Sequence, residues 1–350
     1  MPRPLRIALL AAEEGPAGLW CPSAVACATL AVRELNEAGG LLGRPVALDV
    51  LNIGTSPAAA AEAAGSAIEV HGADAIVGMF PSYARRAVAW AVGRRVPFIY
   101  TPQFEGWETD PSVVTTGETS LELLSAATRW LTGARGARRF FLCGSDYVWP
   151  RSTFSTARRL IREAGGEVVG EEYLPLEGTD FDGVLDRIRA ARADVVLPYF
   201  LGADAIAFNR AFAAAGLARR MLRFSSAIDE TVLYGLDENA TENLYVAAAY
   251  FSTLKSRRNG AFLERYHTAY GDSPPPPNGF GESCYEGVHC LAALAEAAGT
   301  LRPADLLRHV GAAPQRRTAR ALDDAPRAGG RRPIHLARVD GYDFTVIDRL

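Results

Sequence analysis

The chain has 350 residues, of which 49% are hydrophobic and 22% charged, a composition typical of a globular protein long enough for two domains. Its formal net charge of −3 provides no basic face for phosphate groups, so direct binding of nucleic acid is not expected. No apolar run approaches the ~18 residues of a membrane span. The five cysteines include no CxxC pair and are odd in number, which indicates neither a structural zinc nor a disulfide framework.

The first apolar run, residues 5–12, could belong to a leader peptide or to a strand. It is interrupted by Arg6 and followed directly by Glu13 and Glu14, whereas a secretory leader has ~7–15 uninterrupted apolar residues. We therefore expect a first buried strand and a cytoplasmic protein, with an extracytoplasmic location as the alternative if a leader was removed.

Short apolar runs alternate with amphipathic segments from this point on. Strands are predicted at 5–12, 46–53, 73–79, 96–101, 138–144, 167–174, 194–200, 221–226 and 244–251. Helices are predicted between them at 23–38, 57–71, 82–94, 119–133, 151–165, 180–192 and 203–216, with Ser120 and Thr179-Asp180 as candidate N-caps. This alternation is typical of parallel α/β sheets covered by helices, and the length favours two such sheets.

The last hundred residues have a different pattern. Two helices are predicted at 259–270 and 281–298, on either side of the proline run 274–277. The segments PIHLARV and YDFTVID, joined by Asp340-Gly341, predict a β-hairpin with a primed turn. The chain is therefore expected to leave one lobe, build a second lobe and return.

Ligands of open parallel sheets bind beyond the carboxyl ends of the strands. These ends carry aromatic and neutral hydrogen-bonding side chains: Phe80, Ser82, Tyr83, Tyr100, Thr101, Gln103, Tyr147, Trp149, Tyr199 and Ser226, with Asp229 beyond them. A single ring at such a place usually packs under its own loop, but several such ends together favour the wall of a small pocket. The N–H groups of the helix start near Ser82 are suited to a ligand oxygen.

No motif for catalysis, phosphate binding or dinucleotide binding is present, because GxGxxG, GxxxxGK[ST], HExxH and GxSxG are all missing. The five histidines are scattered, and none follows a predicted strand. Cys143 with Asp146 could form a nucleophilic site, although Cys143 is predicted to lie inside a strand. We expect no enzyme, no metal and no cofactor, and a hydrolase using Cys143 is the remote alternative.

Several segments resemble the amide and urea branch of the type I periplasmic-binding-protein-like family, which is related to the Leu/Ile/Val-binding proteins. They are GMFPSYARRAV (78–88), IYTPQFEGWETDPSVVTTG (99–117), GSDYVWPRS (144–152), GGEVVGEEYLPLEGTDF (165–181), FNRAFAAAGL (208–217), AAYFSTLKS (248–256) and SCYEGVHCLAALAEAAG (283–299). The branch includes ABC-transporter binding proteins for urea and short-chain amides. It also includes a cytoplasmic amide sensor that represses aliphatic amidase expression by holding an antiterminator.

The resemblance implies a two-lobed clamp of parallel sheets flanked by helices, with a hinge of three segments. Lobe 1 would hold 1–118 and 252–328, lobe 2 would hold 119–251 and 329–350, and the crossings would lie near 117–120, 249–253 and 326–332. A ligand bound between the lobes would favour the closed state.

The resemblance also implies roles for single residues. Ser82 matches the serine that hydrogen-bonds the amide, and Phe80 stands where amide sensors have a tyrosine. Tyr100 and Tyr147 match pocket tyrosines, and Trp149 stands where relatives carry another aromatic ring.

Two other assignments stay open at this point. Thr101 is ambiguous by one place. A ligand-facing Ser226 would suit a neutral ligand, whereas Asp229 would suit a cationic amine. Asp146 is expected to cap the helix that follows it.

Our first hypothesis is a non-enzymatic receptor for a small neutral polar ligand, a short-chain amide or urea, that signals by clamp closure to an antiterminator-like regulatory protein. The alternative is the substrate-binding protein of an ABC transporter for amides, urea or branched amino acids, with a transporter permease as its partner. A homodimer or a higher oligomer is compatible with both hypotheses.

Overall fold

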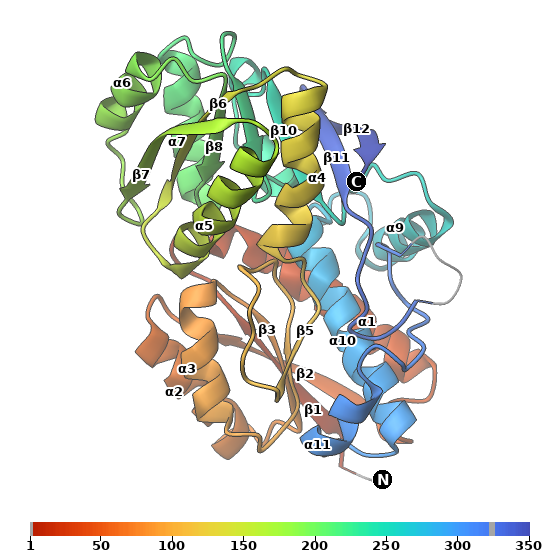
Figure 1. The fold of residues 1–350 in the computed structure, drawn as a ribbon. Helices are drawn as coiled ribbons and strands as arrows, with labels where there is room; N and C mark the ends of the chain where they lie inside the picture. The colour runs from red at the N-terminus through yellow and green to blue at the C-terminus, as the bar shows by residue number, and fades with distance from the viewer. Residues whose placement is uncertain (1–2, 322–325) are drawn as a thin grey trace. The chain divides into compact units, whose positions relative to one another are not determined.

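The structure, a computed structural model, describes residues 3–321 and 326–350. Within these ranges the chain forms two compact α/β units, shown in Figure 1. Unit 1 comprises Met1–Gln103, Trp107–Gly117 and Lys255–Arg332, and unit 2 comprises Phe104–Gly106, Glu118–Leu254 and Pro333–Leu350. Part of the expected lobe 1, residues 1–2 and 322–325, lies outside the described residues.

The sheet of unit 1 has five parallel strands in the order β2-β1-β3-β4-β5. Its strands are β1 (Leu5–Ala11), β2 (Val46–Asn52), β3 (Ala75–Met79), β4 (Phe98–Tyr100) and β5 (Val113–Thr115). The central strands β3 and β4 are buried throughout, because helices cover both faces of the sheet.

The helices of unit 1 form two layers (Figure 1). α2 (Pro57–Glu69) and α3 (Ser82–Val92) pack together on one face of the sheet. α1 (Cys21–Glu37) and α10 (Gly279–Ala298) pack together on the other face. In the chain, α9 (Arg257–Tyr270) precedes α10 and α11 (Pro303–Leu306) follows it. The side chains of Ser56, Ser256 and Asn278 cap the starts of α2, α9 and α10.

Unit 2 is built around a seven-stranded sheet in the order β12-β11-β10-β9-β8-β6-β7. Its parallel strands are β6 (Arg139–Ser145), β7 (Glu167–Leu174), β8 (Val195–Tyr199), β9 (Leu222–Ser225) and β10 (Leu244–Ala248). α4 (Ser120–Gly133) packs on α5 (Val148–Glu163), while α6 (Asp182–Ala190), α7 (Gly202–Ala214) and the short α8 (Glu230–Tyr234) follow β7, β8 and β9.

The chain ends in the predicted hairpin of β11 (His335–Asp340) and β12 (Asp343–Arg349), which adds two antiparallel strands to the unit 2 sheet. Asp340 pairs with Asp343, so the two central turn residues are Gly341 and Tyr342. Gly341 has φ +63° and Tyr342 has no positive φ, which is the pattern of a type II′ turn with glycine in its first central position. The hairpin prediction is confirmed, with the turn centred one residue later than expected.

Every strand and helix predicted from hydrophobic periodicity is present, and the expected α/β fold class is confirmed. The N-cap predictions were wrong. Thr119, not Ser120, caps α4, because its side chain accepts the N–H of Glu122 while Glu122 returns a bond to the Thr119 N–H. The N-cap position of α6 is Phe181, whose side chain makes no capping hydrogen bond. Asp180, which lies before the N-cap, accepts the N–H of Asp182, the first residue of the helix.

The chain passes between the two units several times. The structure changes unit after Gly117, after Leu254 and after Arg332, and a short excursion occurs at 104–106. The domain boundaries expected from the sequence, at 118/119, 251/252 and 328/329, stay predictions.

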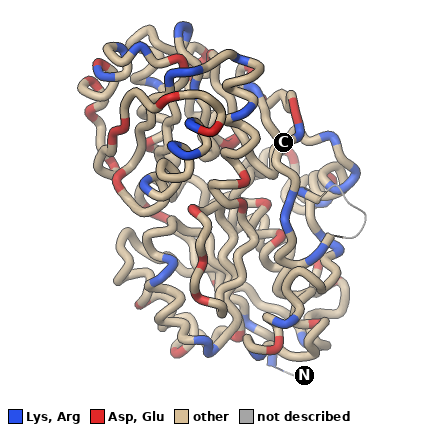
Figure 2. The backbone as a smooth tube through the Cα atoms, in the orientation of Figure 1, with Lys and Arg blue, Asp and Glu red and all other residues tan. Residues whose placement is uncertain are grey.

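Charged residues of both signs are interspersed along the backbone of each unit, as Figure 2 shows. None of the helices in the described ranges is both long and apolar enough to cross a bilayer.

Candidate functional site

The carboxyl edge of the unit 1 sheet brings Phe80, Tyr100 and Thr101 together. Strands β3 and β4 are neighbours, with Gly78 opposite Tyr100, so the residues that follow both strands meet at one edge. The Tyr100 hydroxyl donates to the Phe80 carbonyl oxygen (2.7 Å), and the two rings make an edge contact. The Thr101 hydroxyl donates to the Gly78 carbonyl oxygen (3.1 Å). Both hydroxyl hydrogens are therefore used inside unit 1, and all three side chains are buried.

Ser82 is the first residue of α3 at the same edge. Pro81 occupies the N-cap position and provides no side-chain acceptor for the start of the helix. The helix start carries partial positive charge, which favours an anionic or carbonyl oxygen nearby. Ser82 is only 7% exposed, and Tyr83 beside it is half-buried, as is Gln103 beyond β4.

Next to this edge lies a buried ion pair between Arg85 and Glu108, which was not predicted from the sequence. Arg85, one turn into α3, donates from Nε to Glu108 Oε2 (2.6 Å), and its guanidinium lies 5.1 Å from the Tyr100 ring centre. Arg85 is 4% exposed. The pair holds the loop after β4 against α3. The sequence offers two adjacent arginines here, and only the phase of the helix shows which one is buried.

The carboxyl edge of the unit 2 sheet carries a row of three rings. Tyr147 and Trp149 follow strand β6, and Tyr199 ends the neighbouring strand β8. The ring centre of Trp149 lies 6.3 Å from that of Tyr147 and 5.1 Å from that of Tyr199. All three are at most 9% exposed. Burial raises the pKa of the Tyr199 hydroxyl, while the neighbouring Ser226 side chain opposes the shift. The structure thus groups four of the predicted residues.

Some polar atoms at this edge are buried and have no hydrogen-bond partner in the described part of the chain, and two of them lie near the end of β6. They are Nε1 of Trp149 and the hydroxyl oxygen of Ser145, the last residue of β6. A buried polar group without a partner costs about 1–3 kcal/mol, so such a group usually bonds to a ligand or to a water. Ser145 was not predicted, because serine at the end of a strand is too common to signal a site.

Adjacent carboxyl groups follow strand β9. Asp229 is the N-cap of α8, where its Oδ1 accepts the Val232 N–H (3.0 Å). Glu230 accepts the Ser252 N–H on Oε1 (2.6 Å), whereas its buried Oε2 has no hydrogen-bond partner among the described residues. Burial, followed by the nearby charge of Asp229, raises the pKa of Glu230 to about 7. Glu230 was not predicted as a site residue, because an Asp-Glu pair that follows a strand more often marks the start of a helix.

The expectation that Asp146 caps α5 was wrong. The N-cap of α5 is Tyr147, without a side-chain bond, and Asp146 instead accepts the Arg151 Nε at 2.6 Å on the surface. This ion pair competes successfully because Arg151 lies one turn into the helix and reaches back to the carboxylate.

Cys143 lies inside β6 and is fully buried. Burial raises the pKa of this thiol well above its usual value, and the charge of Glu172 adds to the shift. A protonated, inaccessible thiol is a poor nucleophile, which disfavours the hydrolase alternative.

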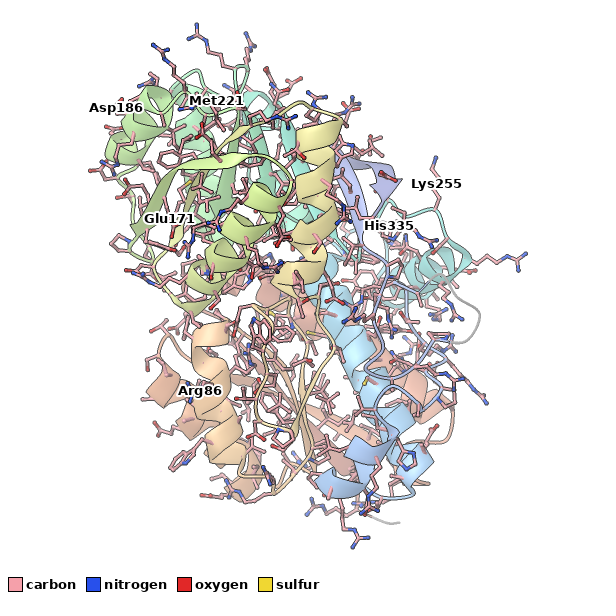
Figure 3. The ribbon with its side chains drawn as sticks, viewed as in Figure 1. Arg86, Glu171, Asp186, Met221, Lys255 and His335 are labelled. Carbon is pink, nitrogen blue, oxygen red and sulfur yellow. The ribbon has the colours of Figure 1, made fainter. Side chains whose placement is uncertain are left out.

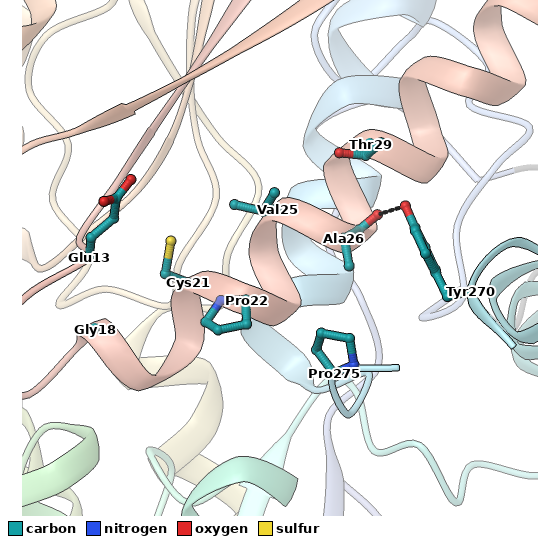
Figure 4. Close-up of a pocket in the computed structure, with 9 residues that line it drawn as sticks. All are labelled: Glu13, Gly18, Cys21, Pro22, Val25, Ala26, Thr29, Tyr270 and Pro275. Carbon is teal, nitrogen blue, oxygen red and sulfur yellow. Dashed lines mark hydrogen bonds between the residues drawn. The ribbon is translucent and has the colours of Figure 1, made fainter. Parts of the chain in front are cut away.

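Two hollows lie away from the predicted residues. One, of about 570 Å³ in unit 1, lies between α1 and the turn after α9 and is shown in Figure 4. Its walls are mostly apolar, and the Tyr270 hydroxyl donates to the Ala26 carbonyl oxygen beside it. The other, of about 380 Å³, is lined by polar residues at the amino ends of the unit 2 strands, including Arg135, Asp194 and Arg220.

Comparison with known protein families decides the identity of the fold. A profile described as periplasmic binding protein matches residues 4–341. The chain belongs to this periplasmic binding protein family. The match confirms the family resemblance expected from the sequence, while the assignment to its amide and urea branch stays a prediction.

Curated relatives of this binding protein include the Leu/Ile/Val-binding protein homolog 6 of Brucella melitensis, which is 23% identical over 226 residues. The alignment covers 63% of this chain and 54% of the relative. The chain thus spans about half the length of the curated relatives that it matches.

Solved structures show the same fold over almost the whole binding protein. An ABC transporter substrate-binding protein from Sphaerobacter thermophilus is 24% identical with a TM-score of 0.83, and covers 99% of this chain and 98% of its own. LivJ of Streptococcus pneumoniae, in complex with isoleucine, is 17% identical with a TM-score of 0.85 (99% and 100% covered). A solute binding protein of Rhodopseudomonas palustris, in complex with p-hydroxybenzoic acid, is 20% identical with a TM-score of 0.87 (99% and 96% covered).

These findings favour the alternative hypothesis over the first one. The family is one of ligand-binding proteins, and the names of these relatives refer to transport and to binding of amino acids or benzoates. They give no support to amide or urea binding, to transcription regulation or to a cytoplasmic sensor.

Proposed function

We propose that this binding protein is the substrate-binding component of an ABC transporter and that its ligand is a small organic carboxylate. It would act outside the cytoplasm and deliver the ligand to a membrane permease. This replaces the cytoplasmic amide sensor as the preferred function.

The start of α3 carries the proposal. Ser82 places a buried hydroxyl at a helix N-terminus that has no side-chain cap, at the edge of the sheet where ligands of this fold class bind. N–H groups and a hydroxyl at a helix start donate to a carboxylate with the favourable sign of the helix dipole. A carboxylate gains more here than a neutral amide, because hydrogen bonds to charged groups are stronger.

The ligands named for the structural neighbours share this group. Isoleucine and p-hydroxybenzoic acid differ in size, charge and aromatic character, yet each carries one carboxylate. A common carboxylate is therefore the feature of those ligands that transfers most readily to the Ser82 edge.

The unit 2 edge carries its own groups that are suited to contact a ligand. Its row of rings offers an apolar surface, and Trp149 Nε1 is a buried donor without a partner in the residues described. Glu230 offers an acceptor oxygen that is likewise unpaired. An aliphatic amino acid would use this acceptor for its ammonium, whereas a hydroxylated aromatic acid would use it for its hydroxyl.

A thermal-shift screen distinguishes these chemistries. The protein is unfolded, dialysed and refolded to remove any bound ligand, then heated with L-isoleucine, L-leucine, benzoate or 4-hydroxybenzoate, and with acetamide and urea as neutral comparators. We expect one of the carboxylates to raise the melting temperature, because a ligand that binds only the folded state stabilises it. Stabilisation by acetamide or urea alone would return the amide hypothesis to first place.

The variant Ser82→Ala tests the residue that carries the proposal. We expect the affinity for the carboxylate found in the screen to fall by about 1.5 kcal/mol, roughly tenfold in Kd, through the loss of a hydrogen bond to a charged group. Isothermal titration calorimetry measures the change. The control is Ser125→Ala, which removes a hydroxyl that donates to Leu121 on the exposed side of α4. Equal affinities of the two variants would contradict the role of Ser82.

A further inference from the structure

Two of the connections between the units begin at residues that are tied to the same helix of unit 1. The chain leaves unit 1 after Gly117 and again after Arg332. Thr116 and Arg332, which lie at these exits, are linked to α10 through a buried polar network of Glu286, Thr318, Arg320 and Arg332, here called the Glu286 network.

Glu286 is the shared acceptor of this network. Its Oε2 accepts the Thr318 hydroxyl (2.6 Å) and the Arg320 Nε (3.0 Å). Its Oε1 accepts the Arg332 Nε (2.6 Å). Each carboxylate oxygen therefore holds a different arginine.

Arg320 carries the link from Glu286 to the first exit. Its Nη2 donates to the Thr116 carbonyl oxygen (3.1 Å), one residue before Gly117. The exit is tightly packed at that point, because a Cβ added to Gly117 would lie 1.9 Å from the Pro102 carbonyl oxygen. The segment of unit 1 before the first exit thus has little freedom to shift independently of α10.

The network is buried and strongly charged. Glu286 and Arg320 are each 1% exposed. Although burial alone would raise the pKa of Glu286, the charges of Arg320 and Arg332 hold this pKa well below its usual value. The second acid of the helix face, Glu282, lies 2.9 Å from the Arg320 Nε, and burial raises its pKa. Glu286 is the anion that both arginines require, since removing one partner leaves a buried charge uncompensated.

We propose that Glu286 is a positioning residue that restrains both exits from unit 1 together and thereby limits how freely the two units move. In a binding protein this restraint would set the cost of the opening and closing that accompanies ligand exchange, a consequence that rests on the function proposed above. Glu286 makes no ligand contact in this proposal.

The test compares Glu286→Gln with Glu34→Gln in ligand-free protein. Glu34 is a matched control, because it is a buried acid of unit 1 whose oxygens accept Arg265 Nε (2.6 Å) and the Tyr285 hydroxyl (2.8 Å). It also pairs with Arg317 (3.5 Å), but its partners are not members of the Glu286 network. Both variants lose a buried ion pair, so a general loss of stability affects them alike.

The first readout is hydrogen exchange by mass spectrometry on peptides that contain 113–117 and 327–334. We expect Glu286→Gln to speed exchange in both peptides by about tenfold, because local opening becomes easier, and Glu34→Gln to leave both unchanged. The variant Arg332→Gln releases only one arginine, and we expect it to speed exchange in 327–334 more than in 113–117.

The second readout is the spread of the distance between spin labels on the two units. Arg86 on α3 and Asp186 on α6 are exposed and suit labelling after substitution by cysteine (Figure 3). We expect pulsed electron paramagnetic resonance to give a broader distance distribution for Glu286→Gln than for the native protein, with Glu34→Gln unchanged.

The proposal would be overturned if folded Glu286→Gln gave the same distance distribution as the native protein, even if its hydrogen exchange were faster. Glu286 would then stabilise only the segments around it and would not restrain the motion of the two units. If Glu286→Gln does not fold, the same two readouts on Arg332→Gln decide. No ligand is used in either experiment, so the outcome does not depend on whether the proposed transport function is correct.

Discussion

Glu230 shows how far a single residue can depart from its ordinary chemistry at the edge of the unit 2 sheet. It is 3% exposed, next to Asp229, and one of its oxygens has no hydrogen-bond partner among the residues described. Burial and the charge of Asp229 raise its pKa to about 7. Because this value exceeds the value of 4.5 usual for a glutamate, folding favours the protonated form.

The sign of the pH dependence follows from this shift. The stabilisation from protonated Glu230 is fully present below the unfolded pKa of 4.5 and is lost as the pH rises through about 7. We expect Glu230→Gln, which stays neutral and can still accept the Ser252 N–H, to melt higher than the native protein at about pH 8, with the difference shrinking as the pH falls and vanishing below the unfolded pKa of 4.5. The full effect is about 3 kcal/mol for a shift of this size.

Thermal melting of ligand-free protein across this pH range measures the effect. The control is Glu163→Gln, which neutralises an exposed acid that pairs with Arg159 on the surface. A gap between Glu230→Gln and native protein that does not change with pH would show that Glu230 titrates as an ordinary glutamate.

At the residue scale, the sequence could place side chains at strand ends but could not show which of their atoms are already bonded. Ser82 and the rings of Tyr147, Trp149 and Tyr199 lie where parallel strands end, as predicted from the order of apolar runs. The use of the Tyr100 hydroxyl by Phe80, and of Asp146 by Arg151, depends on helix phase and side-chain reach. Whether these atoms come within hydrogen-bonding distance is decided by the folded structure, and it produces no periodic pattern in the sequence.

At the element scale, the start of α4 is held by a capping box. The Thr119 hydroxyl accepts the Glu122 N–H, and Glu122 Oε2 accepts the Thr119 N–H (2.8 Å). Ser120, the residue predicted as the cap, instead shares a hydrogen bond with Thr153 of α5 (2.6 Å). The start of α4 is therefore fixed by Thr119, while Ser120 joins α4 to its neighbour.

We expect Thr119→Ala to destabilise unit 2 by about 1 kcal/mol, because the first turn of α4 loses its side-chain acceptor. Chemical denaturation followed by circular dichroism measures the loss. Thr268→Ala is the control, since this threonine only donates to Glu264 within the exposed surface of α9. If both variants lose the same free energy of unfolding, the capping role of Thr119 is refuted.

Elements inside an apolar run or an amphipathic segment of the sequence were predictable, and short elements outside such a pattern were not. Hydrophobic periodicity needs several turns or alternations to become visible, and most predicted elements are long enough to show it. The strands β4 and β9 have only 3 and 4 residues, but each lies inside a longer apolar run of the sequence. The elements missed are β5, α8 and α11, which have 3, 5 and 4 residues. The position of β5 is fixed by its pairing with β4, which is a tertiary contact.

At the scale of the whole molecule, the sequence predicted the family and the fold class but favoured a different role and ligand. The neutral-ligand hypothesis depended on the resemblance to the amide and urea branch, in which Ser82 matches the serine that hydrogen-bonds an amide. The N–H groups of this helix start can donate to an amide oxygen or to a carboxylate. The structure adds Glu230 and the unpaired Trp149 Nε1, neither of which favours an amide in particular. The choice between amide and carboxylate depends on a few kcal/mol of hydrogen bonding, which composition and periodicity do not encode.

The central claim is that this binding protein takes a small carboxylate at the Ser82 edge. Isothermal titration calorimetry of refolded, ligand-free protein with L-isoleucine, 4-hydroxybenzoate and acetamide tests it most directly. We predict saturable one-site binding of one carboxylate and no heat of binding with acetamide. Binding of acetamide with no response to either carboxylate would contradict the claim.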